Sequence, residues 1–373
     1  MTELNDDVRQ EPLEVPAEPA PTGDELLEHT RSMVGYHYTV DDYYEVGREE
    51  VRKHATAVQA AHPVHWSEAA AAEMGHDTLV AHPTYVSVLG IIAQRKLFEE
   101  VVTGYDLWQI MQSDQRLVYH RPMKVGDQLI CDVSLDAFRR ITKPADAEAG
   151  TGPEVIDLMV TKNVIWNQHD EPVMTTWTSL AARPGLQVPP ELEASLDHVM
   201  MKIDKTGVPG KTVFREGGRY ELPDPTERPA AYAAVSFDTL EKGQELPPKT
   251  FRISRGNLAN YAGVAADPNP IHFSDHVIEA SGGMDDVVAH GMQTMGLGAT
   301  YVSEFIGDPS AFCEYNVRFT SPVYVPADTC AELEFTGKIK SLDPETRRGT
   351  IALVAKQDGR KIFGRANVVV QFN

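Results

Sequence analysis

The stretch AADPNPIH, Ala265 to His272, places a carboxylate and an imidazole five positions apart, at Asp267 and His272, in a segment stiffened by two prolines. Such a pair can exchange protons with a carbon acid and with a hydroxyl group or water. A second segment, VVAHGM at Val287 to Met292, opens a long apolar run. Backbone N–H groups at the start of a helix can bind a developing enolate oxygen. The two segments together indicate proton abstraction beside a thioester carbonyl.

Each of these residues has an ordinary explanation when it is taken alone, because Asp before Pro commonly forms a turn and a lone His is commonly structural. Their order resembles the MaoC-like (R)-specific hydratase and dehydratase family, whose motif reads Y-A-x-x-S-G-D-x-N-P-I-H followed by A-H-G-M. This sequence departs from the motif at Ala265 and Ala266, where Ser and Gly are usual, and the change narrows the backbone angles open to the loop. The matching residues are Tyr261, Ala262, Asp267, Asn269, Pro270, Ile271 and His272, then Ala289, His290, Gly291 and Met292.

The resemblance implies a role for each matching side chain. Asp267 and His272 would move the protons, and which of them is acid and which is base stays open. Asn269 would hold the loop or a water through its amide, and the N–H of Gly291 would bind the thioester oxygen. The substrate site would be lined by Tyr261, Ala289, His290 and Met292.

The resemblance also implies an α+β fold, the double hot-dog, in which two antiparallel sheets each wrap a long central helix and pair as a pseudo-dimer. The apolar run that starts near Val287 is interrupted by His290, Gln293 and Glu304, so we interpret it as a buried core helix and not as a membrane span. A hairpin turn is expected at Asp358 and Gly359. The periodicity predicts the helix over 287–305 and strands over 314–319, 330–339, 349–356 and 363–372.

The first half of the chain repeats the second in weakened form. The three aligned pairs of segments are 54–68 with 261–275, 79–85 with 287–293, and 119–127 with 319–328. His65 then falls on His272, whereas Ala60 falls on Asp267 and Pro83 on Gly291. Because proline has no backbone N–H, the first copy is predicted to lack both the acid and the oxyanion donor. The common order of the three pairs indicates a tandem duplication.

The two halves also resemble two different subunits. Residues 34–58 and 160–183 are similar to the non-catalytic subunit of the actinobacterial (3R)-hydroxyacyl-ACP dehydratase, and the second half is similar to its catalytic partner. This resemblance covers roughly residues 33–373. It implies that the first half forms the groove for the acyl chain, that the second half supplies the chemistry, and that each chain has one site.

A chain of 373 residues is long enough for two domains with a tail and a linker. The composition predicts a disordered, acidic and proline-rich tail over 1–28 and a linker over 186–232. The resemblance implies that a degenerate hot-dog domain occupies 29–185 and a catalytic hot-dog domain 233–373. No apolar signal peptide is expected at the start. Cys131, Cys313 and Cys330 show no pairing or metal spacing, which favours a reduced, cytoplasmic setting with the thiols as small core residues.

The formal net charge of −21 argues against nucleic acid and an anionic membrane as partners. The expected partners are an acyl-ACP or acyl-CoA substrate, a second copy of the chain, or other fatty-acid elongation enzymes. Basic residues at the pocket mouth would bind such an anionic carrier, although each pair is also explained as a solvated turn. The candidate pairs are Arg139 with Arg140, Arg347 with Arg348, and Arg360 with Lys361.

No cofactor and no metal is expected. Asp267, His272 and His276 are residue types that bind metals, but Pro268 and Pro270 are expected to hold the segment extended, without the helical i, i+4 spacing of metal-binding histidines.

The expected function is reversible removal of water from a (3R)-3-hydroxyacyl thioester in type II fatty acid elongation, with mycolic acid elongation as one setting. One alternative is an (R)-specific enoyl-CoA hydratase of fatty acid breakdown or polyhydroxyalkanoate supply. A second alternative is a hot-dog protein that binds acyl thioesters without catalysis. A thioesterase is disfavoured because it would lack the DxNPxH loop.

Overall fold

The computed structural model describes most of the chain, and the statements below concern the described part. The described residues are 23–40, 42–105, 110–144, 154–184, 190–199, 214–216, 234–281 and 284–373.

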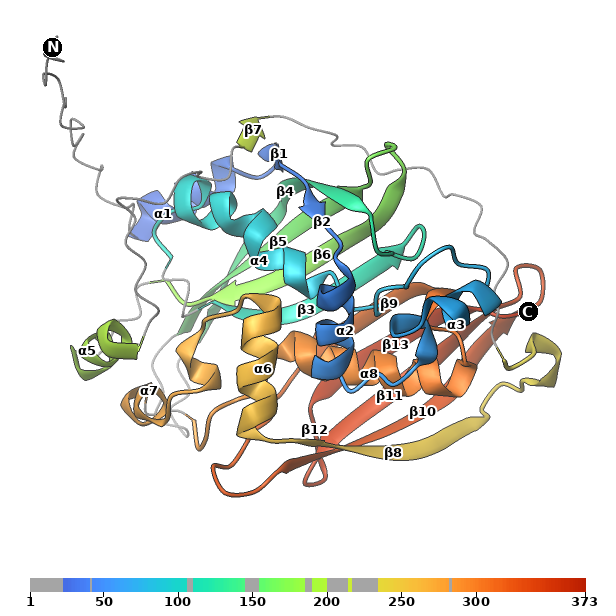
Figure 1. Cartoon of the computed structure of the whole chain (residues 1–373). Coiled ribbons are helices and arrows are strands. Elements are labelled where there is room, and N and C mark those ends of the chain that lie inside the picture. Colours follow the sequence, from blue (N-terminus) through green and yellow to red (C-terminus); the bar gives the residue numbers. More distant parts are fainter. Residues whose placement is uncertain are drawn as a thin grey trace, which may run out of the picture.

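One antiparallel sheet runs through both halves of the chain (Figure 1), in the order β7-β1-β4-β5-β6-β3-β9-β13-β11-β10-β8. The first-half strands are β1 (His37–Val40), β2 (Tyr44–Glu45), β3 (Met111–Tyr119), β4 (Gln128–Lys143), β5 (Glu154–Trp166) and β6 (Pro172–Ala182), with β7 (Phe214–Glu216) beyond them. The second-half strands are β8 (Glu245–Ile253), β9 (Phe312–Phe319), β10 (Ala331–Asp343), β11 (Arg348–Gln357), β12 (Arg360–Lys361) and β13 (Phe363–Gln371).

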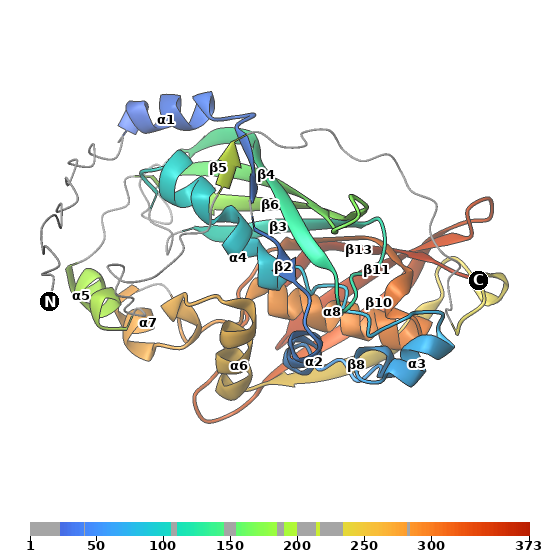
Figure 2. The ribbon, with the colours of Figure 1, turned by 45° about the horizontal axis from the view of Figure 1, so that its top comes forward.

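The helices gather on one face of this sheet, as Figures 1 and 2 show from two directions. In the first half they are α1 (Gly23–Ser32), α2 (Arg48–Ala57), η1 (Pro63–His65), α3 (Glu68–Glu73), α4 (Ser87–Lys96) and the π-helical turn η2 (Leu97–Val101). In the second half they are α6 (Arg255–Ala265), η5 (Pro270–His272), α7 (Asp275–Ser281), α8 (Gly291–Ile306) and the short turns η4 (Phe237–Thr239) and η6 (Pro309–Ala311). α5 (Pro190–Val199) lies between the halves in sequence.

Equivalent hydrogen bonds demonstrate the duplication. The ring nitrogen Nδ1 of His65 donates to the carbonyl of Val80 at 2.7 Å, and Nδ1 of His272 donates to that of Val288, also at 2.7 Å. The backbone repeats the same pattern in both halves: Val80 N to Val64 O with Val288 N to Ile271 O, Ala81 N to Met123 O with Ala289 N to Val323 O, and Val125 N to Leu79 O with Val325 N to Val287 O. The two halves therefore share one local fold.

The two halves meet where β3 pairs with β9. Arg116 lies opposite Asn316 in this antiparallel pair. These two positions are 200 apart, which is the offset that aligns Tyr119 with Phe319. A residue paired with its own equivalent marks a pseudo-two-fold axis. The two sheets expected from the sequence are thus joined edge to edge into one, and each half keeps its own helices.

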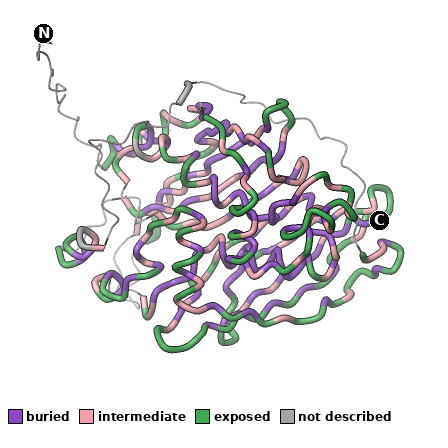
Figure 3. Tube along the Cα trace, in the orientation of Figure 1, coloured by how far each residue is buried: buried purple, intermediate pink, exposed green. Residues whose placement is uncertain are grey.

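The helix α8 forms the centre of the core. Its residues from Gln293 to Ser303 are all buried, and the chain tube in Figure 3 shows the buried segments concentrated in the strands and in this helix. Two glycines allow close packing: a Cβ at Gly296 would lie 2.4 Å from Cγ1 of Val58, and one at Gly298 would lie 2.4 Å from the hydroxyl of Tyr315. Gly296 thus lets the first half approach the helix of the second. None of the described helices is long and apolar enough to cross a membrane.

Three expectations from the sequence need correction. Residues 23–28 of the expected tail belong to α1, because Leu26 is buried against the first half. The expected linker contains α5, which lies against α7, and β7, which pairs with β1. The central helix begins at Gly291 and not at Val287, because Val288 is held extended by a β-bridge to Tyr324. Residues 1–22 and most of 200–233 lie outside the described part.

The predicted second-half strands are otherwise confirmed within a few residues. β9, β10, β11 and β13 occupy the four expected ranges, and the longest extension is at the end of β10. Asp358 and Gly359 have φ values of 50° and 76°, as a tight hairpin turn requires, and the turn joins β11 to the short strand β12.

We predict that Gly296→Ala lowers the free energy of unfolding by about 1–3 kcal/mol, because the added methyl group overlaps the stiff side chain of Val58. The measurement is denaturant unfolding followed by circular dichroism. Gly263→Ala is the matched control, since Gly263 lies in α6 with open space at its Cβ position, and it should stabilise by about 0.5–1 kcal/mol. Equal effects of the two variants would contradict the close packing of the halves.

Candidate active site

The motif loop begins where α6 ends. Ala266 caps the helix in the left-handed region, with φ 52° and ψ 37°. Its position in the motif is usually glycine, which adopts this conformation without strain. The next residue, Asp267, donates its N–H to the carbonyl of Ala262 at 3.1 Å. The left-handed residue therefore turns the chain so that Asp267 leaves the helix end toward α8.

Asn269 holds the loop by its side chain. Its Oδ1 accepts the N–H of Ile271 at 3.2 Å, and its own N–H donates to Oδ1 of Asp267 at 3.2 Å. Pro270 then starts the 3-10 turn η5, in which the missing N–H of proline has no cost. The expectation of an extended segment is thus wrong from Pro270 to His272, because Asn269 caps a short helical turn.

His272 is buried and oriented by the backbone. Its Nδ1–H donates to the carbonyl of Val288 at 2.7 Å, so in the neutral ring Nε2 carries the free lone pair. That Nε2 lies 3.8 Å from Oδ2 of Asp267. This gap is too long for a direct hydrogen bond but is one that a substrate oxygen can bridge. The carboxylate and the imidazole that the sequence placed five residues apart therefore face each other.

His290 completes the cluster from the start of α8. Its ring stacks on that of His272, with centroids 3.6 Å apart, and its Nε2 lies 3.9 Å from Oδ2 of Asp267. The ring of Tyr261 also packs on that of His290, and the centroids of these two rings are 4.9 Å apart. His290 is the N-cap residue of α8 but makes no side-chain capping hydrogen bond. The contact of His290 with Asp267 was not foreseen from the sequence.

Burial keeps both imidazoles neutral. It lowers the pKa of His272 below the ordinary value, although the Asp267 carboxylate and the hydrogen bond to Val288 oppose this shift. Burial also lowers the pKa of His290 far below its usual range, and the neighbouring His272 lowers it further. At neutral pH, His272 is therefore ready to accept a proton at Nε2.

The start of α8 lies beside this cluster, since its N-cap residue is His290. The N–H groups of Gln293 and Thr294 both donate to the carbonyl of His290, so Gly291 and Met292 precede the first hydrogen bond of the helix. Such N–H groups, together with the helix dipole, favour negative charge. A Cβ at Gly291 would lie 3.4 Å from the ring of Phe319, which makes Phe319 a wall of the site. Ala289 is held by its N–H to Val323 O.

The same three side chains have a geometry that could bind a metal ion. Asp267, His272 and His290 each offer a ligand atom, and these atoms lie within 4.8 Å of one another. Two histidines and one carboxylate are a common set of ligands for divalent metals. The argument against a metal from the spacing of Asp267 and His272 does not hold, because the third ligand comes from another segment. His276, which was considered in the sequence, is not in this group.

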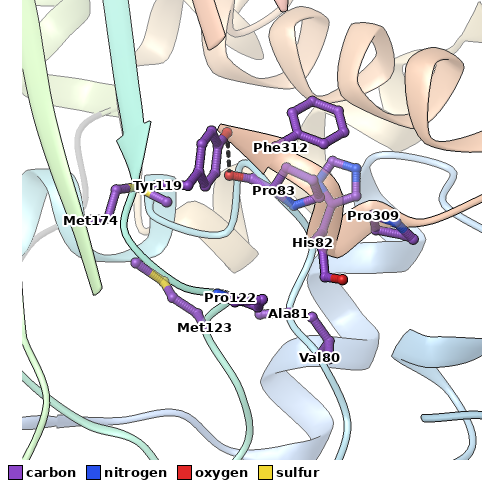
Figure 4. Close-up of a pocket in the computed structure, with 11 residues that line it drawn as sticks. Val80, Ala81, His82, Pro83, Tyr119, Pro122, Met123, Met174, Pro309 and Phe312 are labelled. Carbon is purple, nitrogen blue, oxygen red and sulfur yellow. Dashed lines mark hydrogen bonds between the residues drawn. The ribbon is translucent and has the colours of Figure 1, made fainter. Parts of the chain in front are cut away.

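The equivalent place in the first half is closed. His65 and His82 occupy the positions of His272 and His290, but the rings are 5.7 Å apart, and Nε2 of His82 is bonded to Thr300 at 3.2 Å. A small pocket there is lined by His82, Pro83 and Phe312 (Figure 4). The hydroxyl of Tyr119 donates to the carbonyl of Pro83 at 2.9 Å. The first half thus keeps the same local backbone arrangement, but Pro83 has no N–H at the position of Gly291 and Ala60 has no carboxylate at the position of Asp267.

Most of the basic candidates are engaged elsewhere. Arg140 pairs with the buried Asp157, and Arg347 pairs with Asp238. Arg348 donates to Gln371. Arg360 lies over the ring of Tyr324, the residue that bridges to Val288, whose carbonyl accepts from His272.

The comparisons with known proteins agree with this fold. A family model described as "FAS1-like, dehydratase domain region" matches residues 32–176, and one described as "MaoC like domain" matches residues 238–357. A UPF0336 protein of Mycolicibacterium paratuberculosis is 39% identical over 156 residues, which are 42% of this chain and 91% of that protein.

Two solved structures define the class. A conserved hypothetical protein from Mycobacterium tuberculosis, described as a double hot-dog fold, covers 90% of this chain and 95% of its own with a TM-score of 0.57 at 16% identity, and it supports the fold alone. A structure described as "MaoC-like dehydratase" is 38% identical, covers 92% of this chain and 100% of its own, and has a TM-score of 0.81. The fold is therefore a double hot-dog. The chain belongs to the MaoC-like dehydratase family, as the sequence motif predicted, and this membership points to a hydro-lyase.

We predict that Ala266→Gly raises the free energy of unfolding by about 0.5–1 kcal/mol. The left-handed conformation costs an L-residue about 1–2 kcal/mol, and the greater unfolded-state entropy of glycine offsets about 0.4–1 kcal/mol of the gain. Thermal unfolding measures the effect. Ala265→Gly, one residue earlier and inside α6, should destabilise, so a shift of the same sign in both variants would refute the strain at Ala266.

Proposed function

We propose that the chain removes water reversibly from a (3R)-3-hydroxyacyl thioester to give the trans-2-enoyl thioester, in type II fatty acid elongation. The observation that carries this proposal is the convergence of Asp267, His272 and the start of α8 on one point. A base next to a charge-stabilising helix start is what removal of a proton beside a thioester carbonyl requires.

In the proposed reaction, the thioester oxygen binds at the N–H of Gly291. Nε2 of His272 accepts the C2 proton, because Nδ1 is engaged with Val288. The electrons of the C2–H bond form the C2=C3 double bond while the C3–O bond breaks. As this bond breaks, the proton that His272 took from C2 is passed to the departing hydroxyl group under the direction of Asp267, so the group leaves as water and His272 is neutral again. Asn269 holds Asp267 through the loop, and an exchange of roles between Asp267 and His272 stays open.

The substrate wall would include the other motif residues. Tyr261 and His290 pack together beside Asp267, and Met292 packs against the cluster around Tyr261. Ala289 positions the segment before the helix. No step of this reaction needs the metal ion that the cluster would admit.

The nearest alternative uses the same residues in the direction of hydration, as an (R)-specific enoyl-CoA hydratase of fatty acid breakdown or polyhydroxyalkanoate supply. The closed first-half site favours the biosynthetic assignment, because a half released from catalysis is free to form a groove for a long chain. An acyl-thioester-binding protein without catalysis is disfavoured, since a binder has no need of both Asp267 and His272. Mycolic acid elongation is one pathway that such a groove would serve.

The carrier in this proposal is acyl carrier protein or coenzyme A, and elongation enzymes or a second copy of the chain are the proposed protein partners. We place the reaction in the cytoplasm, in keeping with three free cysteines, of which Cys131 and Cys313 are buried in strands and Cys330 is exposed. The expectation that all three are core residues is thus wrong for Cys330.

Asp267→Asn and His272→Ala should each lower turnover by about 10²- to 10⁴-fold, the usual contribution of a general acid or base. The measurement is loss of the absorbance of the conjugated enoyl thioester, with trans-2-enoyl-CoA substrates from short to long chains. Circular dichroism of each variant checks that folding is retained. Near-normal activity in both variants would sink the assignment. Binding without turnover by the wild type would favour the non-catalytic alternative.

A further inference from the structure

The strand β3 of the first half carries an irregularity that the second half repeats. The register of β3 against β6 shifts between Gln112 and Asp114, which leaves Ser113 as a bulge. The register of β9 against β13 shifts between Phe312 and Glu314 in the same way. With the offset of 200, Gln112 is the equivalent of Phe312. Bulges of this kind re-aim side chains next to active sites.

On the closed side, Phe312 faces the degenerate site. It lines the pocket together with His82 and Pro83 (Figure 4), and its ring lies 5.9 Å from that of Tyr119. By the pseudo-two-fold relation, the equivalent residue Gln112 should lie at the intact site, beside Gly291. Its contact with the first turn of α8 agrees with this placement.

Gln112 contacts the first turn of α8. Its Nε2 lies 3.5 Å from Sδ of Met292, the residue that follows Gly291. Thioether sulfur is a weak acceptor, so this contact leaves the amide available to a better partner. A half-buried amide from the first half therefore contacts the side chain of the residue that follows Gly291, the proposed oxyanion donor of the second half.

The amide is held in place by an anchored neighbour. Nε2 of Gln112 donates to Oε1 of Gln115 at 2.6 Å, and the same oxygen accepts the hydroxyl of Thr178 at 2.9 Å. Gln115 is buried on the strand. Because Gln115 is fixed by β6 as well as by β3, the head group of Gln112 is pre-organised and loses little freedom on binding.

The chemistry of a thioester substrate indicates which part this amide meets. An apolar acyl tail has no group for it, and burying an unpaired amide against the tail would be unfavourable. The arm that links the sulfur to coenzyme A or to a carrier protein contains amide groups. We propose that Gln112 hydrogen-bonds an amide of this carrier arm, as a specificity residue that the first half contributes to the site of the second. This inference rests on the proposed acyl-thioester function.

The test compares Gln112→Met with the wild type on three trans-2-butenoyl thioesters: those of coenzyme A, of N-acetylcysteamine, which has one amide, and of propanethiol, which has none. Loss of one hydrogen bond commonly costs about tenfold in equilibrium terms. We expect kcat/KM to fall about tenfold, mainly through KM, for the two amide-carrying thioesters. For the propyl thioester, which has no amide that could bond to Gln112, kcat/KM should change less than about twofold. Met111→Leu, at the exposed neighbouring position, is the matched control and should show no such difference.

An equal loss on all three thioesters would overturn the proposal, because it would make Gln112 a structural residue only. A wild type without turnover would count against the proposed function and not against this inference. The same comparison is then made by equilibrium binding of the saturated butanoyl thioesters, which needs no catalysis. In that measurement, Gln112→Met should weaken binding about tenfold for the two amide-carrying thioesters and not for the propyl thioester.

Discussion

The antiparallel pairing of β3 with β9 is the contact on which the rest of the structure depends. It joins the two halves around Arg116 and Asn316 into one continuous sheet. It also brings the inner face of a first-half strand against the helix start of the second half, where Gln112 reaches Met292. The same pairing carries Phe312 to the degenerate first-half site. A separation of the halves would therefore remove a wall from the site that keeps the motif.

The second constraint is the approach of the first half to α8. Gly296 leaves room for Val58, and the hydroxyl of Thr300 donates to the carbonyl of Val58 at 2.8 Å. Tyr261 connects histidines of the two halves. Its ring centroid lies 6.4 Å from that of His54 in the first half, and the same ring packs on His290 in the second. Burial lowers the pKa of His54 to about 3 and that of His65 to about 4. Because these rings are neutral, the first half can bury them in its packed core at little electrostatic cost.

Much of this fold was readable from the residues, because an ordered motif and a strong strand pattern carry their own geometry. The positions of Asp267, His272 and Gly291 followed from the motif, and Ala60 and Pro83 showed that the first copy has neither the carboxylate nor the backbone N–H at the equivalent positions. The start of α8 was placed too early, since nothing local distinguishes an extended Val288 from a helical one.

Contacts between distant segments could not be read from the sequence. The approach of His290 to Asp267, which admits a metal ion, depends on how α8 meets the motif loop. The role inferred for Gln112 depends on the pseudo-two-fold axis and a bulge, neither of which has a sequence signal of its own.

We infer that two histidines in the same backbone setting have different tasks. His272 and His65 each donate Nδ1–H to a carbonyl at 2.7 Å, but only His272 faces a carboxylate. Asparagine at either position can keep that hydrogen bond through its side-chain amide N–H, but it has no atom equivalent to Nε2. The direct measurement is the hydration rate of a trans-2-enoyl-CoA by His272→Asn and by His65→Asn. We predict a loss of about 10²- to 10⁴-fold in the first variant and near wild-type turnover in the second. Equal losses, or a larger loss in His65→Asn, would contradict it.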